Sequence, residues 1–340
     1  MKGRLTIGGR EIRRGTIEQI FLKVSEYYTA TPVNVPVTVI RGREKGPGLF
    51  LTAAIHGDEL NGVEIVRRVM TSITPDQLRG TLICVPVVNR IGFLTHTRYL
   101  QGRRDLNRYF PGNPEGNAAA RMAHALFGEL VQRADYGIDL HTASVGRTNL
   151  PHLRADMANE GVRRRARAFG TEIIIDSIGM SRTLRAAATR AGIPTIIFEA
   201  GETFRFQGNM VTRGVAGVRN VLGSLGMVDE APKEARFQVI IKVSEWVRSM
   251  RGGIADLLVR PGQLIYAGDE IASITNPFGR EVSSVRSPLT GLVIGTTTVP
   301  MVNPGDAICH IAKLEKTLAT VERYCVNESG GRKVLLVGGA

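Results

Sequence analysis

Short, almost wholly apolar segments recur through the first two-thirds of this 340-residue chain, separated by stretches in which apolar residues have helical spacing. An apolar run of this length is typical of a strand that is buried on both faces of a sheet. Helices between such strands cover those faces. We therefore predict an α/β domain. The predicted strands are Leu49–Ile55, Thr81–Asn89, Tyr136–His141, Thr171–Asp176 and Ile193–Gly201, and the predicted helices are Val63–Met70, Ala118–Arg133 and Thr183–Gly192.

The pattern changes at about residue 236, where helical spacing fades and glycine and proline become frequent. Gly268–Ile274 and Gly305–Ile311 share the pattern Gly-Asp-x-Ile-x-x-Ile, which indicates an internal repeat in an all-β region similar to biotinyl or lipoyl β-sandwiches. No lysine that could carry biotin or lipoate occurs between Val243 and Ala312. We divide the chain into an α/β domain (residues 1–235, with leading strands in 1–45), a β-rich domain (236–315) and a loosely held tail (316–340).

The formal net charge of +13 raises the question of a nucleic-acid partner. The densest basic run, Arg163–Arg165, lies in an expected helix without interleaved aromatic residues, so we interpret it as a solvated helix face and predict no nucleic-acid partner. No apolar run is long enough to span a membrane, and none follows the opening residues as a signal peptide would. Cys84, Cys309 and Cys325 are too scattered for a disulfide framework, which favours the cytoplasm.

Without a cysteine site, any bound metal must be held by histidine and carboxylate, and one segment offers both. His56-Gly57-Asp58-Glu59 follows a buried strand and precedes a helix, where a loop can point two side chains at one ion. Zinc in hydrolases commonly takes two imidazoles and one carboxylate, and His141 at the end of another predicted strand supplies the third ligand. The alternative is structural: Glu59 caps or solvates the following helix, and His141 is a hydrogen-bonded strand end.

Glu199 lies at the end of an almost entirely apolar strand, Ile193–Gly201. Burying a charge there costs free energy unless the charge has a partner or a function. Beside a metal-activated water, such a glutamate can accept a proton as general base and return it as general acid. The alternative is an ion pair with one of the many arginines, which is our interpretation for the neighbouring Glu202. For His96, His124, His152 and His310, which lack partners at ligand spacing, we expect structural or solvent-exposed roles.

Motifs in a fixed order resemble the succinylglutamate desuccinylase/aspartoacylase family, relatives of the zinc carboxypeptidases. The resemblance covers roughly residues 45–205. It implies a zinc-carboxypeptidase-like fold, with a mixed central sheet flanked by helices and a smaller all-β C-terminal domain like a barrel-sandwich hybrid. It also implies one zinc ion per chain, held by His56, Glu59 and His141. The motifs are HGDE at 56–59, DLNRYFPG at 105–112, DLH at 139–141 and FEAG at 198–201.

The same resemblance implies roles for residues that would bind the substrate. Asn107 and Arg108 match the pair that holds the substrate's carboxylate, and a guanidinium beside an amide suits a planar carboxylate. The alternative for this pair is a loop held by local hydrogen bonds and a surface ion pair. Arg185 matches a position that binds a second carboxylate, on the side chain of an amino acid.

Two catalytic roles complete the set implied by the resemblance. Arg98 lies where the family places an arginine that polarises the scissile carbonyl and steadies the oxyanion, with Arg103 and Arg104 as competing candidates in the same loop. Glu199 matches the general base.

We therefore predict a zinc-dependent hydrolase that removes an acetyl-class or succinyl-class acyl group from a small N-acylated amino acid. The sequence predicts no membrane partner, and it leaves open whether the chain forms a homo-oligomer. One alternative is a zinc carboxypeptidase that acts on peptides. We expect the C-terminal domain to narrow the cleft and exclude long peptides, which would distinguish this chain from such an enzyme. The other is a protein that binds a metal or an N-acyl amino acid without catalysis.

Overall fold

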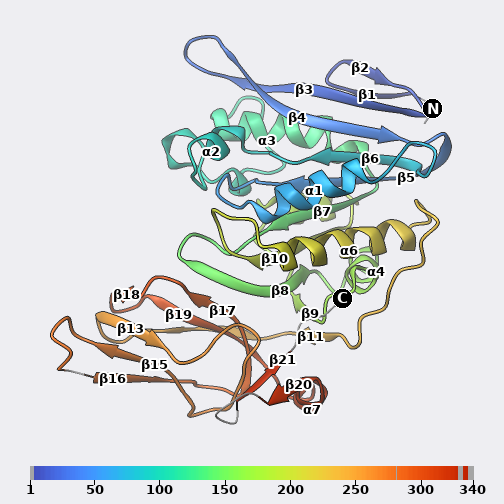
Figure 1. Ribbon diagram of the computed structural model, residues 1–340. Coiled ribbons are helices and arrows are strands. Elements are labelled where there is room, and N and C mark those ends of the chain that lie inside the picture. Colours follow the sequence, from blue (N-terminus) through green and yellow to red (C-terminus); the bar gives the residue numbers. More distant parts are fainter. Residues whose placement is uncertain (1–3, 281, 328–331, 336–340) are drawn as a thin grey trace.

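The centre of the computed structural model, which describes residues 4–280, 282–327 and 332–335, is a thirteen-stranded mixed sheet (Figure 1). Its middle strands are parallel, and the strands on either side of them are mostly antiparallel. Across the sheet the order is β3 (Thr16–Glu26), β4 (Pro32–Arg41), β6 (Arg79–Val85), β5 (Glu44–Ala53), β7 (Tyr136–His141), β10 (Thr195–Gly201), β8 (Arg147–Ala155), β17 (Gly291–Thr297), β19 (Ala307–Lys313) and β12 (Ser244–Arg248), with β9 (Ile173–Asp176) beside β8, β11 (Val239–Ile241) beside β9 and β14 (Leu264–Ile265) beside β17.

The two faces of the middle strands pack into different cores, as the apolar strand sequences predict. On β5, Phe50 belongs to one buried cluster, whereas Leu49 and Leu51 belong to another, because successive side chains of a strand point to opposite faces. Helices cover both faces: α3 (Ala118–Glu129) and α5 (Leu184–Arg190) on the side of Phe50, and α1 (Asn61–Thr71), α4 (Glu160–Phe169) and α6 (Gly208–Ser224) on the other. The predicted α/β class with a mixed sheet is confirmed.

One predicted strand is shorter in the structure. The apolar run Thr81–Asn89 forms β6 only as far as Val85. Pro86 cannot donate a hydrogen bond to a neighbouring strand. Asn89 instead caps α2 (Arg90–Leu94), and its side chain accepts a hydrogen bond from the amide of Gly92.

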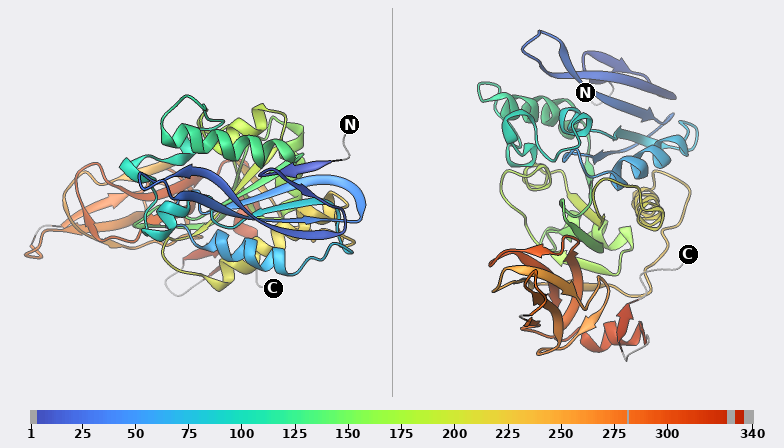
Figure 2. Two further views of the ribbon diagram at one scale, coloured as in Figure 1. Left: turned by 90° about the horizontal axis from the view of Figure 1, so that it is seen from above. Right: turned by 60° about the vertical axis from the view of Figure 1, so that its left-hand side comes forward.

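The C-terminal region is β-rich, as predicted, but part of it continues the central sheet. Strands β12, β17 and β19 extend that sheet beyond β8. A separate antiparallel sheet packs against them, with the order β16 (Val282–Arg286), β15 (Glu270–Thr275), β13 (Gly253–Leu257) and β18 (Met301–Val302) (Figure 2). The domain boundary at residue 235 stays a prediction.

The internal repeat of this region has the same local structure in both copies. Gly268 and Gly305 both adopt a positive φ, of 91° and 92°, which favours glycine. The aspartate that follows accepts a hydrogen bond from a backbone amide three residues upstream, at 2.7 Å for Asp269 and 2.8 Å for Asp306. Each turn leads into a strand, β15 in the small sheet and β19 in the central sheet.

Both ends of the chain add small elements in their described parts. The leading residues form the hairpin β1 (Leu5–Ile7) and β2 (Arg10–Ile12) before β3. The segment predicted to be a loosely held tail instead forms α7 (Leu318–Arg323), β20 (Cys325–Asn327) and β21 (Lys333–Leu335) in its described part. Its buried side chains pack against β11 and β14, since the sheet edge there is apolar. No helix in the described ranges is long and apolar enough to cross a bilayer.

A buried histidine on β8 makes the stability of this fold dependent on pH. The His152 side chain has its Nδ1 atom 2.8 Å from the carbonyl oxygen of Leu150, while Nε2 has no partner among the described atoms. Burial lowers the pKa of His152 to about 3. Between about pH 6.5 and 3 the unfolded chain therefore binds a proton that the folded chain does not, so stability falls as the pH falls through this range.

We expect the titration of this one histidine to lower the free energy of unfolding by about 2 kcal/mol when the pH falls from 7 to 5. Denaturant unfolding of the wild type and of His152→Gln at both pH values measures the effect, since glutamine does not titrate. The stability difference between the two proteins should shift in favour of His152→Gln at pH 5. An equal difference at both pH values would contradict the assignment.

Candidate functional site

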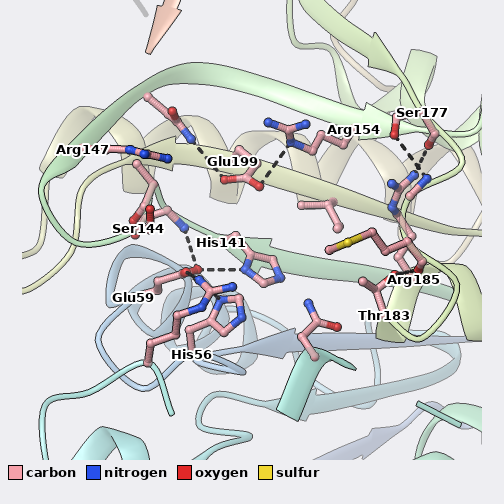
Figure 3. Close-up of a pocket in the computed structure, with 18 of the residues that line it drawn as sticks. His56, Glu59, His141, Ser144, Arg147, Arg154, Ser177, Thr183, Arg185 and Glu199 are labelled. Atoms are coloured by element: carbon pink, nitrogen blue, oxygen red, sulfur yellow. Dashed lines mark hydrogen bonds and ion pairs between the residues drawn. The ribbon is translucent and has the colours of Figure 1, made fainter. Parts of the chain in front are cut away.

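The carboxyl ends of the middle strands border a cavity of about 510 Å³ (Figure 3). The loop between β5 and α1 carries His56 and Glu59, and β7 ends at His141. Glu199 of β10 is the direct strand neighbour of His141. Parallel strands bring these distant segments to one edge of the sheet, where α/β proteins commonly bind ligands. Every predicted site residue lines this cavity: His56, Glu59, Arg98, Asn107, Arg108, His141, Arg185 and Glu199.

The three predicted metal ligands form a tight buried cluster. One ligand atom from each of His56, Glu59 and His141 lies within 4.8 Å of the others. The Nδ1 atom of His56 is 2.7 Å from one oxygen of Glu59, and the Nδ1 atom of His141 is 2.8 Å from the other. Two imidazole nitrogens therefore converge on one carboxylate, which is a donor set that suits zinc.

Two further carboxylates fix the orientation of the imidazoles. Asp139 lies 2.9 Å from Nε2 of His141 and also accepts a hydrogen bond from the Thr52 hydroxyl at 2.7 Å. Asp105 lies 3.2 Å from Nε2 of His56. A carboxylate that binds the outer nitrogen of a metal-ligating histidine leaves the inner nitrogen free to coordinate. The two Nδ1 atoms are thus prepared for an ion, and the cluster fits one.

The pKa shifts in the cluster favour a cation at its centre. Burial alone would raise the pKa of Glu59, but the neighbouring charges of His56 and His141 and their hydrogen bonds hold it well below its usual range. Burial alone would lower the pKa of His141, yet the negative charges of Asp139 and Glu59 raise it well above its usual value. The carboxylates attract a proton in the absence of metal, and they would attract a divalent ion more strongly.

Removing the charge of Asp139 tests whether the outer carboxylate supports metal binding. We expect Asp139→Asn to weaken zinc affinity by about 10- to 100-fold, the usual effect of losing such a partner. Competition with a chromophoric chelator measures the affinity. Asp76→Asn, which changes an exposed carboxylate paired with Arg43, is the control and should bind zinc like the wild type. Equal affinities for all three proteins would mean that Asp139 does not act on the metal site.

Among the three arginines that competed for the catalytic position, Arg98 reaches the cluster. Its guanidinium lies 3.2 Å from Nδ1 of His56 and donates to Asp105 at 2.9 Å. Arg103 and Arg104 are exposed and do not line the cavity. Gly102 and Arg103 both have positive φ, so the backbone makes a tight turn between Arg98 and Arg104.

Asn107, Arg108 and Arg185, the residues predicted to bind the substrate, all line the cavity. The Asn107 side-chain oxygen accepts a hydrogen bond from the Leu184 amide at 2.8 Å, so its NH₂ group is left for a ligand. Arg108 is half-exposed and donates to the carbonyl oxygen of Asn107. Arg185 donates to the carbonyl oxygen of Ser177 at 2.5 Å, and burial lowers its pKa to about 10. Its Nε is buried without a partner among the described atoms.

Glu199 faces the cavity with two partners on the adjacent strand β8. Asn149 donates to one carboxylate oxygen at 3.2 Å, and Nε of Arg154 lies 3.4 Å from the other. The alternative considered for Glu199, an ion pair with an arginine, is therefore present. The same carboxylate also lines the cavity. Glu202 pairs with Arg205 at 2.6 Å, as expected.

Sequence reasoning missed the contribution of β8 and of the C-terminal region. Arg147, Asn149 and Arg154 line the cavity from β8, and Trp246 lines it from β12. The sequence carried little signal for β8, because the stretch 147–155 reads RTNLPHLRA and five of its nine residues are polar, unlike the apolar runs of the predicted strands. None of the four remaining histidines lines the cavity.

Several known proteins resemble this chain in sequence. The catalytic-domain model of the succinylglutamate desuccinylase/aspartoacylase family matches residues 45–225. An N-alpha-acetyl-L-2,4-diaminobutyric acid deacetylase of Halomonas elongata is 26% identical over 301 residues, which cover 84% of this chain and 87% of that protein. A succinylglutamate desuccinylase of Pseudomonas aeruginosa is 31% identical over 119 residues, 32% of this chain and 35% of that protein.

A solved structure has the same fold along nearly the whole chain. The product-bound ectoine utilization protein of Ruegeria pomeroyi superimposes with a TM-score of 0.81 at 23% identity, covering 89% of this chain and 97% of that one. The family model covers more than half of the chain, including the buried cluster and Glu199. The chain therefore belongs to the succinylglutamate desuccinylase/aspartoacylase family.

Proposed function

We propose that this chain is a zinc-dependent hydrolase that removes an acyl group from the nitrogen of a small amino-acid-like substrate. The observation that carries the proposal is the position of Glu199, which faces the same cavity as His56, Glu59 and His141 (Figure 3). A carboxylate near a buried two-histidine, one-carboxylate cluster is the arrangement that amide hydrolysis requires. The deacetylase and the desuccinylase among the relatives support the same reaction class.

A single zinc ion held by the cluster would act as a Lewis acid on the acyl carbonyl and lower the pKa of water. Glu199 accepts the proton of the attacking water and passes it to the amine nitrogen as the carbon–nitrogen bond breaks. Arg98 lies beside His56 and can stabilise the negative charge that develops on the carbonyl oxygen. The products are a carboxylic acid and a free amino group.

The substrate's own carboxylate is assigned to Asn107 and Arg108. The amide NH₂ of Asn107 is oriented by the bond between its oxygen and Leu184, and the guanidinium of Arg108 is half-exposed beside it. Together they can donate several hydrogen bonds to one planar anion. Binding of the carboxylate by this pair would place the scissile amide of an N-acyl amino acid near the buried metal-ligand cluster.

The C-terminal region supports a preference for small substrates. Trp246 of β12 contributes an indole to the cavity wall, so the C-terminal strands restrict one side of the site. A peptide would need that side open to extend away from its last residue. We therefore assign the chain to the deacylases rather than the carboxypeptidases.

The test is a screen of N-acetyl, N-succinyl and N-formyl amino acids together with short peptides. We expect hydrolysis of N-acyl amino acids, loss of this activity with a chelator and recovery with zinc. Faster cleavage of oligopeptides would instead make the chain a carboxypeptidase. Metal and ligand binding without any hydrolysis would make it a binding protein.

A further inference from the structure

The strand next to Glu199 contains a β-bulge that determines which of its side chains face this carboxylate. On β8, His152 lies directly opposite Glu199, and Asn149 lies opposite Gly201. The pairing therefore places one more residue on β8 than on β10 between these two positions. Directly opposite residues point to the same face of a sheet, so Asn149 and His152 both share the face of Glu199. In a regular strand, side chains three positions apart would point to opposite faces.

The bulge gives Glu199 both of its partners. Asn149, on one side of the bulge, donates to one carboxylate oxygen at 3.2 Å, and Nε of Arg154, on the other side, lies 3.4 Å from the second oxygen (Figure 3). Without the extra residue, Asn149 and Arg154 would lie on opposite faces, because they are five positions apart. The orientation of the Glu199 carboxylate therefore depends on the bulge.

His152 holds the bulge through a local hydrogen bond. Its side chain is fully buried, and its Nδ1 atom lies 2.8 Å from the carbonyl oxygen of Leu150, between the two paired positions. Burial and the charge of Arg154 lower the pKa of His152 to about 3, so the imidazole is uncharged near neutral pH. A carbonyl oxygen can only accept, so Nδ1 carries the single proton. This bond constrains the segment where the regular pairing of the two strands is interrupted.

We propose that His152 is a positioning residue for the general base. Its bond to Leu150 holds the bulge that presents Asn149 to Glu199, so it acts on the reaction without lining the cavity. The inference rests on the proposed function, in which Glu199 moves a proton between water and the amine. If the bulge relaxed, Glu199 would lose the donor that fixes one of its oxygens, and fewer of its orientations would suit proton transfer.

The kinetic test compares His152→Leu with His152→Asn in the zinc-loaded full chain, with rates expressed per bound zinc ion. Leucine cannot donate to the carbonyl of Leu150, whereas the amide of asparagine can place an N–H near the position of Nδ1. We expect His152→Leu to lower kcat by about 10- to 100-fold with little change in KM, because a slightly misplaced catalytic group loses rate on this scale. His152→Asn should restore most of kcat. Wild-type kcat in His152→Leu would overturn the inference.

Repeating the substitution in Glu199→Gln shows whether His152 acts through Glu199. Without the carboxylate, His152→Leu should lower the residual kcat by less than about 2-fold, because the effects of residues in one network are not additive. A further fall as large as in the wild-type background would make the role of His152 merely structural and overturn the inference.

Thr195→Val is the matched control. It removes another buried side-chain bond to a carbonyl two residues upstream, the 2.9 Å bond from Thr195 to Ile193 at the start of β10. Its kcat should equal that of the wild type, since Thr195 does not line the cavity. A fall as large as in His152→Leu would reduce the effect to a general loss of packing.

Nuclear magnetic resonance separates this inference from the proposed function, because it requires no turnover. The side-chain NH₂ signals of Asn149, assigned by their loss in Asn149→Ala, report the bond to Glu199. His152→Leu should shift these signals, and His152→Asn should leave them close to their wild-type positions. Signals unmoved by His152→Leu would contradict the inference even if N-acyl amino acids are hydrolysed. Shifted signals in a protein without deacylase activity would support the control of Asn149 by His152 while the proposed function failed.

Discussion

Replacing Glu199 with glutamine is expected to lower kcat for N-acyl amino acid hydrolysis by roughly 100- to 10,000-fold while zinc binding is retained. The amide is nearly the same size as the carboxylate and can still contact Asn149, so the pocket should keep its shape. What it loses is the ability to accept the proton of water and return it to the leaving amine. Steady-state kinetics together with metal analysis of the purified variant measure both properties.

Glu202→Gln provides a control for this experiment. Glu202 is three residues away, pairs with Arg205 and does not line the cavity, so its variant should retain wild-type kcat. Wild-type turnover in Glu199→Gln would remove Glu199 from the mechanism. Loss of both turnover and zinc would give it a role in metal binding instead.

Glu59→Gln is expected to lose both the metal and the activity. Glu59 is the one carboxylate between the two imidazoles and also accepts the amide of Thr142 at 3.1 Å. Glutamine has no negative charge, and its NH₂ group would face nitrogen atoms or the ion. We expect zinc affinity to fall by more than the roughly 10- to 100-fold that is typical of an outer partner. Metal content after dialysis measures the loss.

Glu64→Gln is the matched variant, because Glu64 lies in the helix that follows and pairs with Arg67 and Arg68 outside the cavity. It should keep a full complement of zinc. If Glu59→Gln also retained one zinc per chain with wild-type affinity, the ion would have to lie elsewhere.

The buried cluster could be predicted from the sequence because local patterns determine where its residues lie. His56 follows the apolar strand β5, and His141 and Glu199 are in strands of the same type. Such strands are parallel and adjacent in α/β folds, so their carboxyl ends meet at one edge. A residue's position at a strand end therefore predicted its neighbours, even though the segments are far apart in sequence.

The partners of Glu199 could not be predicted in the same way. Asn149 and Arg154 reach it from β8, which runs antiparallel to β10 and also pairs with the distant strand β17. The register of such a strand depends on long-range pairing, and a shift by one residue would turn these side chains to the other face. Trp246 presents the same difficulty, since β12 reaches the cavity only because the C-terminal strands extend the central sheet.

The most direct test of this account is a titration of zinc into chelator-treated protein while hydrolysis of an N-acyl amino acid is followed. We expect no activity without metal, a linear rise with added zinc and a sharp plateau at one ion per chain. Hydrolysis that continues at the full rate in the metal-free protein would contradict the account, because His56, Glu59 and His141 would then have no catalytic ion to hold.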